Sequence, residues 1–192
     1  MRGGMEAAVH STRQFIGSLD DNGGLVKLDF RNAFNTLRRD TILEAALETL
    51  PETYSYINSS YSSNSKLFFL NHIIESETGV QQGDPLGPLL FCLCLQPILQ
   101  RCKSDLRIGY LDDVTLGGDL QTLVKDVSRI KVEALSIGLQ LNDSKCELIR
   151  SSTSSPCPSF FNNFTDVITS NATLLGSPLL QDAAMTSSLE KG

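Results

Sequence analysis

The chain has 192 residues, which is enough for one domain with a buried core. Hydrophobic residues make up 41% of the sequence and charged residues 20%, a composition that is typical of a globular domain and too apolar for intrinsic disorder. There are 16 Lys and Arg against 22 Asp and Glu, and the resulting net charge of −6 argues against a dedicated nucleic-acid binder, because such proteins normally carry a basic surface.

The N-terminal part of the chain predicts a helix, a strand and a second helix. Apolar side chains recur with helical spacing over residues 5–19. An apolar segment over 25–30 predicts a largely buried strand, and a turn rich in Asp, Asn and Gly separates it from the helix. The next helix is expected over residues 40–50, with Thr41 and Glu44 as a capping box at its start.

The middle of the chain predicts two hairpins with a helix between them. Residues 67–74 are apolar on both sides of an Asn-His pair, which predicts a hairpin with a two-residue turn at that pair. A helix is expected over 88–102, and Pro97 should kink it or end it early. Two short apolar runs within 108–116 flank a pair of aspartates, which predicts a second hairpin with the aspartates at its tip.

The C-terminal part predicts one long helix and shorter elements. An amphipathic helix is expected over 120–135, stopped by Gly138, and a short strand over 146–149. Residues 151–159 are rich in Ser and Pro, which predicts a loop, and a final strand or turn is expected near 174–176. The whole pattern predicts an α+β fold with a largely antiparallel sheet and helices packed on one face.

Three carboxylates stand where folding alone would not favour them. Asp29 interrupts the end of an apolar strand, and Asp112 and Asp113 occupy the tip of an apolar hairpin. Clustered carboxylates repel one another, and a divalent metal relieves the repulsion and prefers hard oxygen ligands. Three aspartates from two strand ends therefore suit a two-metal site. Because neighbours on a strand face opposite ways, we expect Asp112 to join Asp29 as a principal ligand, with Asp113 in support.

Simpler explanations exist for each carboxylate taken alone. An Asp-Asp pair at a hairpin tip is often turn chemistry, since Asp accepts hydrogen bonds from its own backbone. A single Asp after a strand is often the N-cap of a following helix. The residues by themselves leave these interpretations open.

Five segments, in order across residues 25–180, resemble the motifs of reverse transcriptases. They are Leu28-Asp29-Phe30-Arg31-Asn32-Ala33-Phe34, Gly79-Val80-Gln81-Gln82-Gly83-Asp84-Pro85-Leu86-Gly87-Pro88-Leu89-Leu90-Phe91, Tyr110-Leu111-Asp112-Asp113, Gly138-Leu139-x-Leu141-Asn142-x-x-Lys145-Cys146-Glu147 and Leu174-Leu175-Gly176. The second motif is most similar to that of non-LTR (LINE-type) retrotransposon enzymes. The resemblance implies a polymerase palm, and an RNA-directed DNA polymerase that transfers nucleotides to a primer 3′-hydroxyl.

The resemblance also implies cofactors and partners. It assigns Asp29, Asp112 and Asp113 to two Mg²⁺ ions, with Mn²⁺ as an alternative, in agreement with the electrostatic argument. The partners would be an RNA template, a DNA primer and deoxynucleoside triphosphates. Lys145 matches a proposed proton donor to the leaving pyrophosphate, although a solvent-facing lysine is the simpler explanation.

A second group of residues matches positions beside the substrate. Phe34 matches the steric gate that excludes a ribose 2′-hydroxyl, and a core phenylalanine is the alternative. Gln82 and Gly83 match the loop that borders the incoming nucleotide, where Gly allows close backbone approach. Phe30 would offer its backbone carbonyl to a metal, and Tyr110 belongs to the Tyr-x-Asp-Asp box.

The resemblance divides the chain into four regions. Residues 1–24 would be the remnant of a fingers or linker helix, 25–150 the palm core, 151–180 a loop with the primer-grip region, and 181–192 a truncated C-terminal tail. We therefore expect a fragment of a longer polyprotein in which the fingers are largely missing and the thumb is missing.

The compartment follows from what the sequence lacks. The longest apolar run, residues 89–95, is far shorter than the ~18–20 residues that span a membrane, and no signal-peptide pattern occurs. The five cysteines show no Cys-x-x-Cys spacing and are expected to be reduced and mostly buried. We expect an intracellular chain, in the nucleus or cytoplasm, that is not secreted and has no membrane partner.

Two other functions compete with polymerization. The chain could be a catalytically inactive retroelement remnant that folds or binds partners without chemistry, or another palm-fold nucleotidyl enzyme. A nucleotidyl cyclase is disfavoured because its Gly-Gly-Asp/Glu signature is absent from the hairpin tip. An RNA-dependent RNA polymerase is disfavoured by Phe34, because such an enzyme must admit the 2′-hydroxyl.

Overall fold

The computed structural model describes residues 3–150 and 156–180, and its centre is a five-stranded sheet in the order β4-β5-β1-β6-β7. The strands are β1 (Gly23–Leu28), β4 (Leu106–Tyr110), β5 (Asp113–Asp119), β6 (Glu147–Arg150) and β7 (Thr165–Ile168). Neighbouring strands run antiparallel except β6 and β7, which are parallel. The predicted α+β fold with a largely antiparallel sheet is confirmed.

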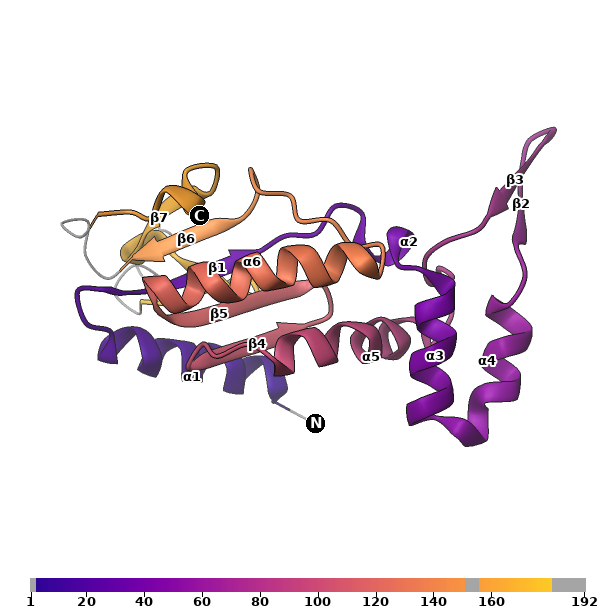
Figure 1. Cartoon of the computed structure of the whole chain (residues 1–192), viewed down its shortest axis with the longest axis horizontal. Helices are drawn as coiled ribbons and strands as arrows, with labels where there is room; N and C mark the ends of the chain where they lie inside the picture. The colour runs from indigo at the N-terminus through magenta and orange to yellow at the C-terminus, as the bar shows by residue number, and fades with distance from the viewer. Residues whose placement is uncertain (1–2, 151–155, 181–192) are drawn as a thin grey trace, which may run out of the picture.

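Helices cover both faces of this sheet (Figure 1). Helices α5 (Gly87–Gln100) and α6 (Leu120–Ser136) pack on the face that carries Val26 and Leu28 of β1. Helix α1 (Gly4–Ser18) packs on the opposite face, where Leu25 points. The expectation that the helices share one face therefore holds for α5 and α6 and is wrong for α1. The reason is that β1 is apolar at consecutive positions, so both of its faces need cover.

The remaining elements lie against the second face of the sheet or beyond one end of it. A small two-stranded sheet, β8 (Thr173–Leu174) with β9 (Ser177–Pro178), packs with α1 against the second face. Beyond the end of the sheet, at the right of Figure 1, the chain forms three helices and a hairpin that projects away from the body. They are α2 (Ala33–Thr36), α3 (Arg39–Thr49), α4 (Tyr54–Tyr61), β2 (Ser65–Phe69) and β3 (His72–Ser76), and single 3₁₀ turns occur at Pro51–Thr53, Ser159–Phe161 and Thr169–Asn171.

Three local predictions need correction. No capping box opens α3, because the helix already begins at Arg39, and the backbone N–H of Thr41 donates to Asp40 Oδ1 at 2.7 Å. Of the two effects expected at Pro97, an early end of helix α5 is wrong, because the helix continues to Gln100 with Ile98 buried in the core beyond the proline. In the first hairpin Phe69 pairs with His72, so the turn lies one residue earlier than predicted.

Helices α2 and α4 and strand β7 were not predicted. Residues 151–155 of the predicted loop and the predicted tail over 181–192 lie outside the described residues. Within residues 3–150 and 156–180, no helix combines the length and the apolar character that crossing a membrane requires.

Candidate active site

The register of β1 against β5 brings two of the predicted carboxylates together. Leu28 stands opposite Val114 in the antiparallel ladder, so the next residues outward, Asp29 and Asp113, stand opposite each other where the ladder ends. Residues that face each other across an antiparallel pair point to the same side of the sheet. Asp29 and Asp113 therefore share the face that α1 and β8–β9 cover farther along the strands.

A cavity of about 250 Å³ opens at this position. Its wall includes Asp29, Asp113 and Lys145, together with the turn between β8 and β9. The end of β8 and that turn together form Leu174-Leu175-Gly176, the segment that resembles the primer grip. Four segments that are far apart in the sequence thus meet around one small polar cavity.

Asp112 occupies a different place from its neighbour. It lies in the turn between β4 and β5, directly after Leu111, whose φ of 57° is in the left-handed region. The cavity lining includes Asp113 and does not include Asp112. The negative charge of Asp112 acts on Cys92 of α5, whose pKa is raised mainly by burial and further by this carboxylate. The assignment of Asp112 as a principal metal ligand, with Asp113 in support, stays a prediction.

The electrostatics of the cavity show an excess of negative charge. Partial burial raises the pKa of the Asp113 carboxyl, and repulsion from Asp112 and Asp29 raises it further. Lys27 lowers the pKa of Asp113, but the Lys27 ammonium is also 2.8 Å from Glu147 Oε2 across β1 and β6. Lys27 is thus shared between the Asp113 and Glu147 carboxylates.

The carboxylate donors fit a hard divalent cation chemically, since Mg²⁺ takes one or two carboxylates and keeps several waters. Asp29 and Asp113 supply two such groups on one face, and Asp112 adds charge from the adjoining turn. Over the described parts of the chain, no three His, Cys, Asp or Glu side chains already lie close enough to hold an ion together. The residues present are therefore chemically compatible with a hard divalent cation.

Asp29 is anchored through its backbone by the segment that carries Lys145. Its carbonyl accepts from the Asn142 N–H at 2.8 Å, and its own N–H donates to Cys146 Sγ at 3.4 Å. Lys145 belongs to a turn in the same segment, in which its N–H donates to Asn142 O at 2.8 Å. Cys146 is fully buried, as predicted, and burial raises the pKa of its thiol to about 11. Apart from the motif itself, nothing in the sequence predicts that Cys146 lies beneath Asp29.

Phe34 and the loop over residues 79–87 form a second part of the site. Phe34 lies in α2, and its ring stacks on Phe91 with a centroid distance of 4.6 Å. Its carbonyl accepts from Val80 N at 2.8 Å, which attaches the loop to α2. Gln82 Nε2 lies 3.5 Å from Asn35 Oδ1, and Gly83 has a φ of 88° with open space around it.

The other two predicted residues lie in separate surroundings. Only 5% of Phe30 is exposed, so its ring belongs to the core and only its backbone could reach a ligand. Tyr110 is 42% exposed and lines a cavity of about 720 Å³ with His10, Arg13 and Leu175. Lys27 and Glu147 were not predicted, although Lys27 stands two residues from Asp29 on the same strand face.

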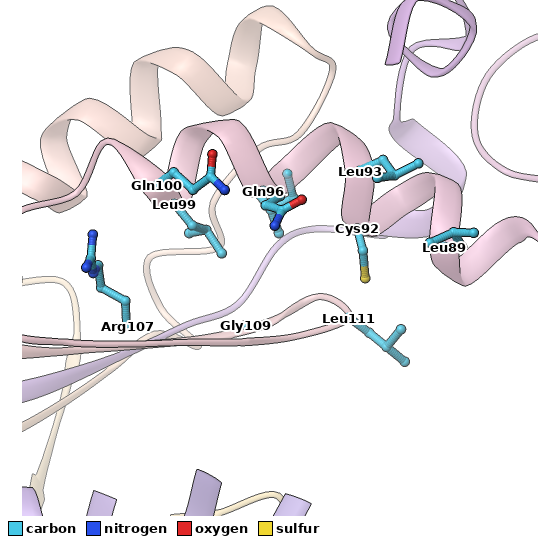
Figure 2. Close-up of a pocket in the computed structure, with 10 residues that line it drawn as sticks. Leu89, Cys92, Leu93, Gln96, Leu99, Gln100, Arg107, Gly109 and Leu111 are labelled. Atoms are coloured by element: carbon cyan, nitrogen blue, oxygen red, sulfur yellow. The ribbon is translucent and has the colours of Figure 1, made fainter. Parts of the chain in front are cut away.

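A larger groove lies outside this site. It runs between α5 and β4, has a volume of about 520 Å³, and is lined mainly by apolar side chains with Gln96, Gln100 and Arg107 (Figure 2). Figure 2 shows the sulfur of Cys92 directed from α5 toward Leu111. None of the three aspartates lines this groove, so we do not assign it to the active site.

A largely antiparallel sheet with two helices on one face, and with aspartates at a strand end and an adjoining hairpin, is the architecture of a polymerase palm. The comparison with protein families identifies which polymerases. The reverse transcriptase (RNA-dependent DNA polymerase) family matches residues 5–178, and the chain belongs to this family.

Several retrotransposon proteins are similar in sequence. The chain is 31% identical over 159 residues to the retrotransposable element SLACS 132 kDa protein of Trypanosoma brucei gambiense, covering 77% of this chain and 13% of that protein. It is 31% identical over 139 residues to the Pol polyprotein from the type-1 retrotransposable element R2 of Nasonia vitripennis, covering 64% and 14%. The chain thus spans a small part of the curated relatives it matches.

Solved telomerase structures share the fold. The apo telomerase of Candida tropicalis superimposes with a TM-score of 0.59 at 12% identity, covering 78% of this chain and 33% of that one. Telomerase from Candida albicans, in complex with a fragment of telomeric RNA, gives a TM-score of 0.60 at 13% identity, covering 83% and 33%. At this identity the likeness concerns the fold alone, and it confirms the predicted palm.

Proposed function

We propose that the chain is the reverse transcriptase domain of a non-LTR retrotransposon and copies RNA into DNA by extending a primer. The observation that carries this proposal is the register that sets Asp29 opposite Asp113, beside Lys145, in one cavity. Membership of the family and the similarity to R2 and SLACS proteins support the same reaction. The partners would be an RNA template, a DNA primer and deoxynucleoside triphosphates.

Asp29, Asp112 and Asp113 would hold two Mg²⁺ ions, or Mn²⁺ in their place. When bound, these ions would activate the primer 3′-hydroxyl and stabilise the leaving pyrophosphate. The contribution of the chain is then mainly positioning. The sheet register fixes Asp29 relative to Asp113, and the bond between Asn142 N and Asp29 O ties the lysine segment to the same strand end.

The remaining residues have proposed roles around the nucleotide. Lys145, which is exposed at the cavity wall, would donate a proton to the pyrophosphate. Phe34 would exclude the 2′-hydroxyl, and its support by Phe91 suits a steric gate because a stacked ring cannot easily move away. Gln82 and Gly83 would border the nucleotide, Tyr110 would face the substrate strand, and Phe30 would offer its carbonyl. In this arrangement residues 25–150 form the palm core and the segment around Leu174 the primer grip.

A primer-extension assay tests the proposal. We expect the wild-type chain to add deoxynucleotides to a DNA primer on an RNA template with Mg²⁺ weakly and without processive synthesis, and Asp29→Asn and Asp113→Asn each to lower the rate by a factor of about 10³ or more, since each removes a charge from the metal site. Asp166→Asn is the matched control, because Asp166 lies on β7 outside the cavity.

The competing functions predict other results. A wild-type chain that extends no better than Asp29→Asn contradicts the catalytic proposal and leaves the inactive remnant. Preferential incorporation of ribonucleotides would instead indicate another palm-fold nucleotidyl enzyme. Equal loss in Asp166→Asn would show that the effect does not come from the cavity.

A further inference from the structure

Arg39 is a buried cation that the proposed chemistry does not use. It stands at the start of α3 with 7% of its surface exposed. Its guanidinium donates to the Gly79 carbonyl at 3.3 Å, the Ser63 carbonyl at 3.1 Å and Ser76 Oγ at 3.0 Å. Burying an arginine is costly unless its donors are satisfied. These bonds join α3 to the start of the loop over residues 79–87 and to both ends of the β2–β3 hairpin.

Tyr61 continues the same network into the loop. Only 2% of it is exposed, and its ring lies below the Arg39 guanidinium at 5.8 Å. Its hydroxyl donates to Asp84 Oδ2 at 2.5 Å and accepts from the Gln81 N–H at 3.1 Å. Asp84 Oδ1 in turn accepts from the Leu86 N–H at 2.9 Å. One phenol thus holds two points of the loop that borders the proposed nucleotide site.

The start of the loop is fitted closely to α2. Gly79 N donates to Leu37 O at 2.7 Å, and a Cβ at Gly79 would come within 2.5 Å of the Asn35 backbone. Val80 N donates to the carbonyl of Phe34, the proposed steric gate. A shift of the loop therefore changes the position of the gate relative to Gln82 and Gly83.

From these contacts we propose that Arg39 and Tyr61 are positioning residues that set the gap between Phe34 and the loop over residues 79–87, and with it the selectivity for deoxynucleotides. The proposal rests on the proposed function. Neither side chain lines the cavity at Asp29 and Asp113, so both act through the loop and not on the reacting atoms. Part of the network can be removed by mutation, because Tyr61→Phe keeps the ring beneath Arg39 and loses only the two hydrogen bonds of the hydroxyl.

Amide hydrogen exchange tests whether the network holds the loop. We expect Tyr61→Phe to raise exchange of residues 79–87 by about tenfold, because two anchoring hydrogen bonds are lost, while exchange in β1 and α6 is unchanged. Tyr56→Phe is the matched control on the same helix, since Tyr56 is 60% exposed. Unchanged exchange in Tyr61→Phe would overturn the proposal whether or not the chain is active.

Single-nucleotide extension tests the consequence for selectivity. We expect Tyr61→Phe to raise KM for the deoxynucleotide about tenfold, leave kcat within about threefold, and lower the preference for deoxy- over ribonucleotide about fivefold. Asp84→Asn has one oxygen for the two donors, the Tyr61 hydroxyl and the Leu86 N–H, so we expect it to lower the preference less than Tyr61→Phe does. A purely structural role would reduce kcat and the folded fraction with KM and selectivity unchanged, and that result would overturn the proposal.

The proposed function and the positioning role of Tyr61 can be contradicted separately. A wild-type chain that does not extend the primer contradicts the proposed function and the selectivity role with it, while hydrogen exchange still decides whether Tyr61 holds the loop. An active wild type with unaltered KM and preference in Tyr61→Phe contradicts only the positioning role.

Discussion

At the scale of the residue, Tyr61 shows how burial and one hydrogen bond change a titration. The pKa of the phenol is raised to about 12, mainly by burial and then by donation to Asp84, which outweighs the lowering by the Gln81 N–H. The folded chain therefore holds the Tyr61 proton more tightly than the unfolded chain, whose tyrosine has the ordinary value of 10.0. The corresponding stability is complete below pH 10.0 and is lost as the pH rises toward about 12.

Tyr61→Phe should remove this pH dependence. We expect the free energy of unfolding in urea to fall between about pH 9 and pH 11 in the wild type, and to fall by at least about 1 kcal/mol less in Tyr61→Phe. Tyr56→Phe should behave as the wild type does. Parallel decreases in all three proteins would show that the Tyr61 phenol is not the group that titrates.

The candidate site also shows what single residues reveal in a sequence. Asp29 and the Asp112–Asp113 pair stand out because folding alone does not favour a carboxylate in an apolar strand or hairpin. Lys27 does not stand out, although the period of two along a strand places it on the face of Asp29. Arg39 and Tyr61 could not be predicted as a unit, because their partners in the loop are 40 and 23 residues away and are set by tertiary packing.

At the scale of the element, the predictable segments are those with one strongly apolar side. Helix α6 places Leu123, Val127 and Ile130 on its buried face, and its N-cap Asp119 accepts from the N–H groups of Gln121 and Thr122. Helix α4 has a weak pattern, because only Ile57 and Tyr61 are buried among serines and an asparagine. Strand β7 has no fully buried residue and exists through its parallel pairing with β6. The apolar pattern in the sequence of β7 is too weak to predict a strand.

The β2–β3 hairpin is the element whose apolar side chains are least covered by the rest of the fold. Phe68 is 77% exposed and Leu70 is 87% exposed at its tip, and Leu70 has a φ of 52°, which is unfavourable for a leucine. Exposed apolar groups at a strand end favour aggregation. Replacing them removes little packing within the chain.

We therefore expect Phe68→Ser combined with Leu70→Gly to reduce self-association in sedimentation or light scattering, with the free energy of unfolding changed by less than about 0.5 kcal/mol. Phe161→Ser is the matched control, since Phe161 is 2% exposed, and we expect it to cost about 3–5 kcal/mol. A comparable loss of stability in the hairpin variant would show that its tip packs in solution against another part of the protein.

At the scale of the whole molecule, the net charge of −6 takes on a more specific meaning. Part of it gathers where Asp29, Asp112 and Asp113 meet, and their mutual repulsion works against the folded state. Such local instability is common where function and stability compete. The acidity that seemed to argue against nucleic acid is thus in part the charge that two divalent ions would offset.

Mg²⁺ should consequently stabilise the chain as a whole, since a ligand that binds only the folded state raises its stability. We expect about 10 mM Mg²⁺ to raise the thermal midpoint of the wild type by roughly 2–4 °C, measured by differential scanning calorimetry. Without metal, Asp29→Asn should melt at or slightly above the wild-type midpoint, because one repelling charge is gone, and added Mg²⁺ should shift it little. Asp166→Asn, on the distant strand β7, should keep the full shift. A rise with Mg²⁺ that is the same in all three proteins would come from general screening of the acidic surface, and would locate no ion at the aspartates.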